Sequence, residues 1–212
     1  MNSSDLELKR WNERFGAEDY VFGTRPNAFL STQRDRLKPG MKALCVADGE
    51  GRNSVSLASL GLQVTAFDFS AVGLSKASRL AEANNVKVDY RVSDVERWDW
   101  DAQAYDVVVA IFVQFASPAV RARMFAGMVR TLKPGGPLII QGYRPEQLAY
   151  ATGGPKLIEN LYTEDLLRQS FASLQILHLV SHDDAIDEGP GHSGMSALVD
   201  FVGEKLPCHR AP

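Results

Sequence analysis

Short apolar segments alternate with longer amphipathic segments along the chain, and this order predicts a succession of strands and helices. The apolar segments fit buried strands at residues 43–47, 62–67, 86–92, 105–112 and 138–143. The segments between them have helical spacing at residues 52–60, 70–84 and 117–132. Strict alternation of strand and helix favours a parallel sheet, because parallel strands need a crossover connection between them.

The two ends of the chain depart from this alternation. Near the start, residues 6–15 predict an amphipathic helix, and Pro26 suits the first residue of a second helix that runs to about Leu37. Near the end, Thr163 suits the cap of a last helix. The final strands are expected at residues 174–180 and 196–203, joined by a glycine-rich, acidic loop at residues 182–194. Two successive strands without a helix between them predict an antiparallel hairpin.

Composition narrows the class of protein. The chain has 212 residues, which is enough for one sizeable core. Its net charge of −3 gives no support for nucleic-acid binding, which usually needs a basic excess. No apolar stretch is long enough for a membrane span, and the polar start does not read as a secretory signal, so we expect a cytoplasmic protein without a membrane partner. Two cysteines, Cys45 and Cys208, indicate no disulfide framework, and the four histidines show no metal-ligand spacing.

The most informative motif follows the first predicted strand. Asp48-Gly49-Glu50-Gly51 separates that strand from a helix that begins near Arg52. Glycines at such a turn let the backbone approach a ligand closely, and the helix points free N–H groups at it. Asp68 ends the second strand, where a carboxylate can accept hydrogen bonds from both hydroxyls of a ribose. The pair predicts a cofactor that contains a nucleoside.

Charge distinguishes two cofactor classes. A dinucleotide fingerprint requires G-x-G-x-x-G/A, and the segment from Gly49 to Ser54 lacks its last position. Asp48 and Glu50 would also repel a pyrophosphate, whereas they would attract the ammonium and sulfonium groups of S-adenosyl-L-methionine. The motif therefore favours the methyl donor over a nicotinamide cofactor. A glycine turn that binds no ligand is the remaining alternative.

The order of several motifs resembles one known family. The chain is similar to the class I S-adenosylmethionine-dependent methyltransferases, and within them to the tellurite-resistance and thiopurine methyltransferase-like subgroup. The matching segments are residues 11–15, 20–23, 26–27, 46–53, 93–95 and 132–136, with Asp68 as the acidic ribose ligand. Cys45 stands where the family usually has Asp, and Ala47 where it usually has the first glycine.

The resemblance implies a fold. It is a Rossmann-like seven-stranded sheet of order 3-2-1-4-5-7-6, with strand 7 antiparallel and helices on both faces. We expect one methyltransferase domain over residues 1–212, with a helical cover at residues 1–40 and an αβ core at residues 41–205. The cofactor should lie at the carboxyl ends of strands 1 and 4, where the strand order reverses.

The expected cofactor contacts come from four strand ends. They are Asp48, Gly49, Glu50, Gly51, Asn53, Asp68, Phe69, Ser93, Asp94, Val95, Ile111 and Phe112. Each has a simpler alternative: a strand-tip Asp often caps a helix, and Asp94 could be a turn former. Arg52 and Asn53 could bind the methionine carboxylate or face water.

The acceptor site is expected among segments that surround the methyl group. The candidate contacts are Trp11, Arg14, Tyr20, Phe22, Gln114, Gln147, Lys156 and Glu188. Methyl transfer needs a base only when the acceptor arrives protonated, and His192 and Tyr143 are the candidate catalytic residues. Gln114 stands where subgroup members often carry His, and Trp11 could equally be a core residue.

These observations favour a monomeric methyltransferase that acts on a small molecule, such as a thiol or a metalloid oxyanion. The sequence leaves two other classes open. One is a protein that binds S-adenosylmethionine or S-adenosylhomocysteine without catalysis. The other is a nicotinamide-dependent oxidoreductase, which the acidic residues near the phosphate position disfavour.

Overall fold

Seven strands form one mixed sheet in a computed structural model that describes residues 3–207. The order β3-β2-β1-β4-β5-β7-β6 confirms the expected topology. The strands are β1 (Lys42–Val46), β2 (Gln63–Asp68), β3 (Val88–Val92), β4 (Val107–Ile111), β5 (Pro137–Tyr143), β6 (Leu174–Asp187) and β7 (Ser193–Lys205). The first five strands are parallel, and β7 pairs antiparallel with both β5 and β6.

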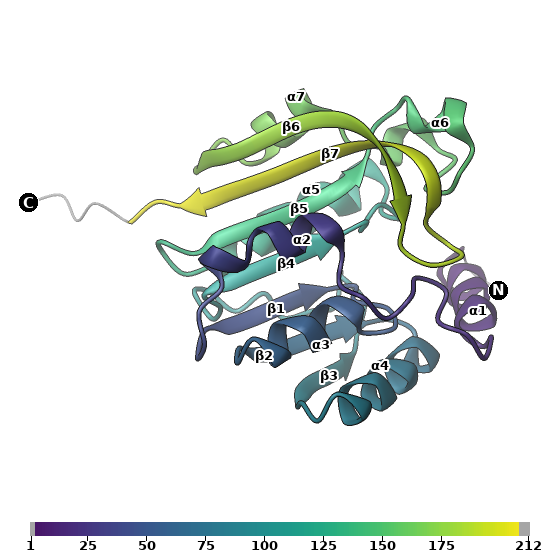
Figure 1. The fold of residues 1–212 in the computed structure, drawn as a ribbon. Coiled ribbons are helices and arrows are strands. Elements are labelled where there is room, and N and C mark those ends of the chain that lie inside the picture. Colours follow the sequence, from purple (N-terminus) through teal and green to yellow (C-terminus); the bar gives the residue numbers. More distant parts are fainter. Residues whose placement is uncertain (1–2, 208–212) are drawn as a thin grey trace, which may run out of the picture.

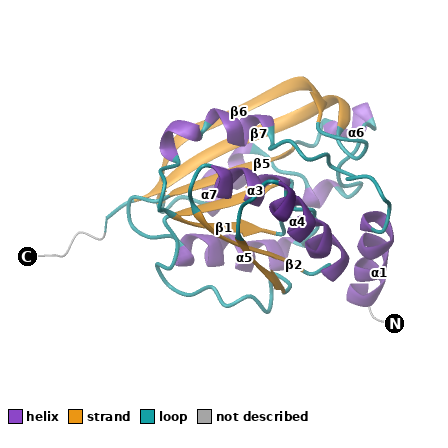
Figure 2. Cartoon of the chain, turned by 60° about the horizontal axis from the view of Figure 1, so that its bottom comes forward, coloured by secondary structure: helices purple, strands orange, loops and turns teal. Residues whose placement is uncertain are grey.

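Helices cover both faces of this sheet (Figures 1 and 2). They are α1 (Ser3–Phe15), α2 (Ala28–Thr32), α3 (Arg52–Ser59), α4 (Ala71–Ala83), α5 (Pro118–Thr131), α6 (Gln147–Tyr150) and α7 (Glu164–Ser170), with short 3-10 turns η1 (Arg34–Arg36) and η2 (Ile158–Asn160). The expected caps are present, since the Ser70 and Thr163 hydroxyls accept hydrogen bonds from the backbone N–H groups of Gly73 and Leu166. Among residues 3–207, no helix has the length and apolar character that a membrane crossing requires.

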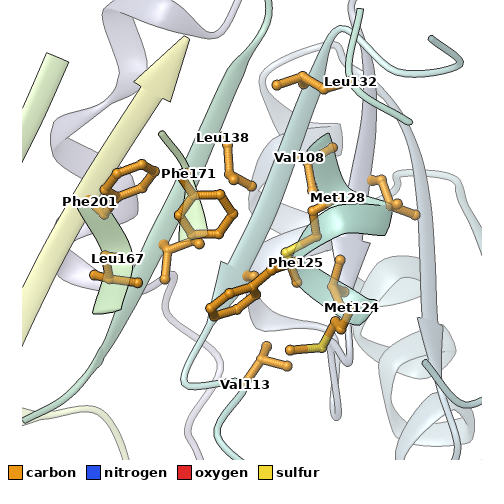
Figure 3. Packing of buried hydrophobic residues seen from close by; sticks show 14 of the residues in the cluster. Val108, Val113, Met124, Phe125, Met128, Leu132, Leu138, Leu167, Phe171 and Phe201 are labelled. Atoms are coloured by element: carbon orange, nitrogen blue, oxygen red, sulfur yellow. The ribbon is translucent and has the colours of Figure 1, made fainter. Parts of the chain in front are cut away.

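The main core lies between the sheet and α5 and α7. Phe125 and Met128 of α5 pack with Leu138 and Phe201 of the sheet, and Phe171 joins them (Figure 3). A second cluster on the opposite face places α2 and α3 against β1, β2 and β4. Because both faces are covered, β1 and β4 are almost entirely apolar and buried, as expected for parallel strands. Cys45 is a free, buried thiol in β1, and Cys208 lies outside the described residues.

The prediction of one helix from Pro26 to Leu37 is wrong. The helix begins after Asn27, whose side-chain oxygen accepts a hydrogen bond from the Leu30 N–H, and α2 ends at Thr32. A separate 3-10 turn, η1, follows it. Pro26 was expected as the first helical residue, but Asn27 ends the preceding extended segment and caps the helix, because its side-chain oxygen is a hydrogen-bond acceptor.

The prediction of a long loop at residues 182–194 is also wrong. The β6–β7 hairpin continues through that segment, and its last pair joins Asp187 to Ser193. Polar, exposed side chains hid this extension, because the apolar pattern stops before the strand does. The hairpin end, residues 187–193, bends toward α1 at the carboxyl edge of the sheet (Figure 1).

Candidate functional site

The loop between β1 and α3 has the backbone conformation that glycine favours. Gly49 and Gly51 have φ of 60° and 90°, and Ala47 adopts a φ of 48° although it carries a Cβ. A Cβ on Gly51 would lie 2.6 Å from the Cβ of Ala77, so this glycine also lets α3 and α4 meet closely. The turn therefore depends on its glycines for both conformation and packing.

Asp68 fixes the loops that follow β1 and β2. Its carboxylate accepts hydrogen bonds from the Gly49 N–H at 3.0 Å and from the Ser70 N–H at 2.8 Å. Burial raises the pKa of Asp68 to about 6, and these N–H groups partly oppose that shift. Each carboxylate oxygen can accept more than one hydrogen bond, so both oxygens keep acceptor capacity.

Asp48 is a half-buried residue whose carboxylate has spare acceptor capacity. Burial raises its pKa to about 7, and a hydrogen bond from Ser54 opposes the shift. Its Oδ2 atom is buried and has no hydrogen-bond partner among the described residues. A cationic group placed nearby would satisfy this oxygen and favour the ionised form.

Glu50 is used differently from the sequence expectation of a cofactor contact. Its Oε1 lies 2.6 Å from the Lys76 Nζ in an ion pair that is almost completely buried. Its Oε2 accepts hydrogen bonds from the backbone N–H groups of Val21 and Phe22. These contacts tie the loop after β1 to the expected helical cover at residues 1–40, called the cover from here on.

The start of α3 also holds the cover. Arg52 forms a buried ion pair with Glu188 of the hairpin end, at 2.7 Å. The Oε1 atom of Glu188 accepts two hydrogen bonds of 2.9 Å, one from the Asn27 side-chain amide and one from the Ala28 backbone N–H. Asn53 accepts one from the Asn27 N–H at 3.0 Å. Glu188 and Asn53 therefore connect the hairpin end, the cover and α3.

Aromatic rings of the cover lie over the glycine loop. Phe15 is buried, and a Cβ on Gly49 would lie only 3.3 Å from its Cζ atom. Trp11 is half-buried and its ring centroid lies 5.2 Å from that of Phe15. The Arg14 guanidinium lies over the rings of both Trp11 and Phe22, at 5.2 and 4.8 Å. The cover thus presents an apolar surface to the loop and a cation at its edge.

A second aromatic group lies at the ends of β4 and β5. The His192 ring centroid is 4.4 Å from that of Phe22, 4.3 Å from Phe112 and 5.7 Å from Tyr143. Phe112 has a φ of 57°, a strained conformation for a bulky residue and one that is common at functional sites. We name these four residues, Phe22, Phe112, Tyr143 and His192, the aromatic cluster.

Burial controls the protonation of the aromatic cluster. It lowers the pKa of His192 to about 3, with smaller contributions from the charges of Arg52 and Arg14, so the imidazole is neutral at pH 7. It also raises the pKa of Tyr143, so the phenol keeps its proton. Neither candidate catalytic residue is therefore a strong base in this arrangement.

Several other predicted acceptor contacts have structural partners. Gln114 donates to the Tyr143 carbonyl at 2.9 Å and accepts from the Tyr143 N–H at 2.6 Å. Gln147 accepts from the Ala197 N–H, and the Tyr20 hydroxyl donates to the Lys76 carbonyl. Lys156 is exposed on the segment after α6.

The segment after β3 contains the expected turn. Asp94 Oδ1 accepts hydrogen bonds from the N–H groups of Glu96 and Arg97, which is the turn-forming alternative. Ser93 is half-buried and Val95 is buried. Ile111 and Phe69 are half-buried at the ends of β4 and β2, with Phe69 stacked on Phe115.

Two residues that hold the cover were missed by sequence reasoning. Lys76 donates to the carbonyls of Ala17 and Asp19 besides pairing with Glu50, and Asn12 accepts from the Ser70 hydroxyl at 2.6 Å. A signal for Lys76 was present, because it is a charged residue on the buried side of α4. The sequence did not indicate that Glu50 is the ion-pair partner of Lys76.

The site was then compared with known proteins. A family model for a methyltransferase domain matches residues 43–136. The ubiquinone biosynthesis O-methyltransferase of Rickettsia akari is 34% identical over 113 residues, 53% of this chain and 44% of that protein. The enzyme of the same name from Xanthomonas axonopodis pv. citri is 34% identical over 159 residues, 72% of this chain and 64% of that protein.

Solved structures agree on the fold. A SAM-dependent methyltransferase structure from Methanosarcina mazei has a TM-score of 0.66 at 18% identity and covers 82% of this chain and 97% of that chain. TehB from Haemophilus influenzae has a TM-score of 0.68 at 16% identity and covers 94% of this chain and 67% of that chain. Residues 43–136 therefore carry a methyltransferase domain, and the chain has the fold of a SAM-dependent methyltransferase.

The residues of this methyltransferase domain fit its cofactor, S-adenosylmethionine. The glycine loop, the carboxylate at the β2 tip and the unpartnered oxygen of Asp48 suit a nucleoside that carries positive charge. The chain spans about half the length of the first curated relatives that it matches.

Proposed function

We propose that the protein transfers the methyl group of S-adenosylmethionine to a small-molecule acceptor. The observation that carries this proposal is Asp68, a buried carboxylate at the β2 tip that is held by the Gly49 N–H of the glycine loop. In this position a carboxylate can bind ribose hydroxyls while the loop backbone stays close to the ligand. We further propose that residues 41–205 form the catalytic core, with residues 1–40 as its cover, and that the protein acts as a monomer.

The cofactor contacts are proposed on the same geometry. Asp68 would bind the ribose, Gly49 and Gly51 would allow close approach of the backbone, and Asp48 would face positive charge. The strand-end residues Phe69, Ser93, Asp94, Val95, Ile111 and Phe112 would surround the adenosine. Glu50 and Asn53 would act indirectly, because their hydrogen bonds hold the cover in place.

When bound, the cofactor would supply an electrophilic methyl group for a lone pair of the acceptor, with the sulfide as the leaving group. The chain contributes water exclusion, through Phe15 over the loop and through the aromatic cluster. It also contributes orientation, because the cover is anchored at Glu50 and Glu188.

The acceptor is proposed to arrive as a nucleophile that needs little help from a base. His192, with a pKa of about 3, and Tyr143, with a raised pKa, would remove a proton poorly at neutral pH. A thiolate, an ionised hydroxyl or an oxyanion meets this requirement. The named relatives that act in ubiquinone biosynthesis support an oxygen acceptor, and the structural similarity to TehB keeps the tellurite-resistance subgroup in the proposal.

The same absence of a strong base supports one second candidate, a protein that binds the cofactor without turnover. One experiment separates the two. Purified protein is incubated with S-adenosylmethionine and a panel of thiols, phenols, selenite and tellurite, and S-adenosylhomocysteine is quantified. Its formation with one acceptor class supports the enzyme. Tight S-adenosylhomocysteine binding without turnover across the panel supports the binding protein, and binding of NADH in its place contradicts both.

A further inference from the structure

Three buried polar groups near the aromatic cluster lack a partner among the described residues. They are the Nη1 of Arg52, the hydroxyl of Tyr143 and the Nδ1 of His192. These residues are 6%, 1% and 7% exposed, so bulk water does not reach the three groups. Buried polar groups in folded proteins are usually hydrogen-bonded, and a set of unpaired ones at one place indicates a ligand.

The three groups face a common region. The Tyr143 and His192 ring centroids are 5.7 Å apart. Arg52 pairs with Glu188, whose backbone N–H donates to the His192 carbonyl at 2.8 Å. Arg14 approaches from the cover, since a Cβ on Gly191 would lie 2.7 Å from its Nη2 atom. The negative groups near this region are Glu188, paired with Arg52, and Glu50, paired with Lys76. Each of these two carboxylates thus forms an ion pair with its own cation, and neither neutralises the Arg14 guanidinium.

The chemistry of the three groups defines what they can bind. Arg52 Nη1 and the Tyr143 hydroxyl donate hydrogen bonds, and Nδ1 of a neutral imidazole can donate in one of its two tautomers. Donors that converge in a dry site with excess positive charge favour an anionic oxygen group. Phe22 and Phe112 pack on the His192 ring, so the walls of this region are flat and apolar.

We propose that Arg52, Tyr143 and His192 form the recognition site for an anionic oxygen group of the methyl acceptor, a carboxylate or ionised hydroxyl on a flat apolar body. The inference rests on the proposed function, because it names the acceptor class of that same site. The hairpin end carries both Glu188 and His192, so its displacement would open the region to the acceptor.

The test measures binding separately from turnover. The full chain, saturated with S-adenosylhomocysteine, is titrated with benzoate and acetate and with their neutral counterparts benzamide and acetamide. We expect benzoate to bind at least ten times more tightly than benzamide. Equal affinity of each carboxylate and its amide overturns the inference. Failure of S-adenosylhomocysteine to bind would count against the proposed function, and the carboxylate titration would still decide the recognition site.

Two tyrosine variants separate a ligand role from a structural one. Tyr143→Phe removes a hydroxyl without a partner, so we expect an equal or higher melting temperature and a loss of benzoate binding of at least tenfold. The matched control is Tyr162→Phe, which removes a buried hydroxyl that donates to the Val113 carbonyl. It should lower the melting temperature and keep benzoate binding.

The anion could instead be the carboxylate of the cofactor itself, and the same variants decide this. If Tyr143→Phe and His192→Phe weaken S-adenosylhomocysteine binding and leave benzoate binding unchanged, the acceptor assignment is overturned. If both variants keep S-adenosylhomocysteine affinity and lose benzoate, it is supported.

Discussion

The Lys76 ammonium and the Glu50 carboxylate form an ion pair 2.6 Å long with side chains only 3% and 2% exposed. Lys76 lies on α4, and Glu50 lies in the loop after β1. Both also bind the backbone of the cover, Lys76 through two carbonyls and Glu50 through two N–H groups. This ion pair therefore joins the glycine loop, α4 and the cover.

Breaking this pair should destabilise the protein strongly. Lys76→Met leaves the Glu50 charge buried without a partner, which typically costs about 3–5 kcal/mol. Urea denaturation should show this loss, and hydrogen exchange should show reduced protection of residues 17–22. The double variant Lys76→Met/Glu50→Gln should recover much of the stability, because no unpaired charge remains. A single variant as stable as the wild type would mean that the pair does not hold the cover.

Removing the Asp68 carboxylate should weaken cofactor binding. Loss of a charged acceptor for ribose hydroxyls typically costs roughly 1.5–3 kcal/mol, so Asp68→Ala should raise the dissociation constant for S-adenosylhomocysteine by at least tenfold. Asp106→Ala is the matched control, because that carboxylate lies before β4 and is bound by the Lys42 N–H and the Lys133 ammonium. Calorimetry that finds unchanged affinity for Asp68→Ala would limit Asp68 to organising the two loops.

Stability should fall as the pH rises from about 4 to about 7. The pKa values of Asp48 and Asp68 are raised to about 7 and about 6, so in this window the native state keeps protons that the unfolded state has lost. The stabilisation is fully present below the unfolded pKa of about 4 and is lost as the pH passes the folded pKa. Urea midpoints measured from pH 4 to 8 check this, and Asp48→Asn should flatten the curve. A midpoint that rises steadily over this range in the wild type would contradict it.

A side chain at Gly51 should destabilise the protein, whereas loss of the side chain at Ala47 should not. Gly51→Ala places a Cβ 2.6 Å from that of Ala77 on a backbone with φ of 90°. Overpacking and backbone strain each cost about 1–3 kcal/mol, and both apply here. Ala47→Gly is the opposite case, because it relieves a positive φ at Ala47 and should change stability little. Thermal denaturation of both variants gives the comparison, and equal melting temperatures would refute it.

The sequence predicted those structural features that are set by residues close together in the chain. Asp68 could be placed because it ends an apolar strand, and the Ser70 cap could be placed because it precedes a helical pattern. The alternation of strand and helix predicted a parallel sheet with a terminal hairpin, and the resemblance supplied the strand order. These features need no knowledge of distant contacts.

Contacts between distant segments could not be predicted in this way. Arg52 and Glu188 are 136 positions apart, and nothing in either segment marks the other as its partner. The hairpin extension to Asp187 was missed because its side chains are polar and only its backbone is paired. Glu50 and Glu188 were expected to contact the cofactor and the acceptor, and their hydrogen bonds to the cover could not be predicted from the sequence.

The most direct test of the account is methyl transfer with isotope-labelled S-adenosylmethionine across the acceptor panel. We predict labelled product and stoichiometric S-adenosylhomocysteine with an anionic acceptor, and loss of most of this turnover in Asp68→Ala at limiting cofactor. Transfer that is equally fast in Asp68→Ala, or no transfer to any acceptor by protein that binds S-adenosylhomocysteine, would contradict it.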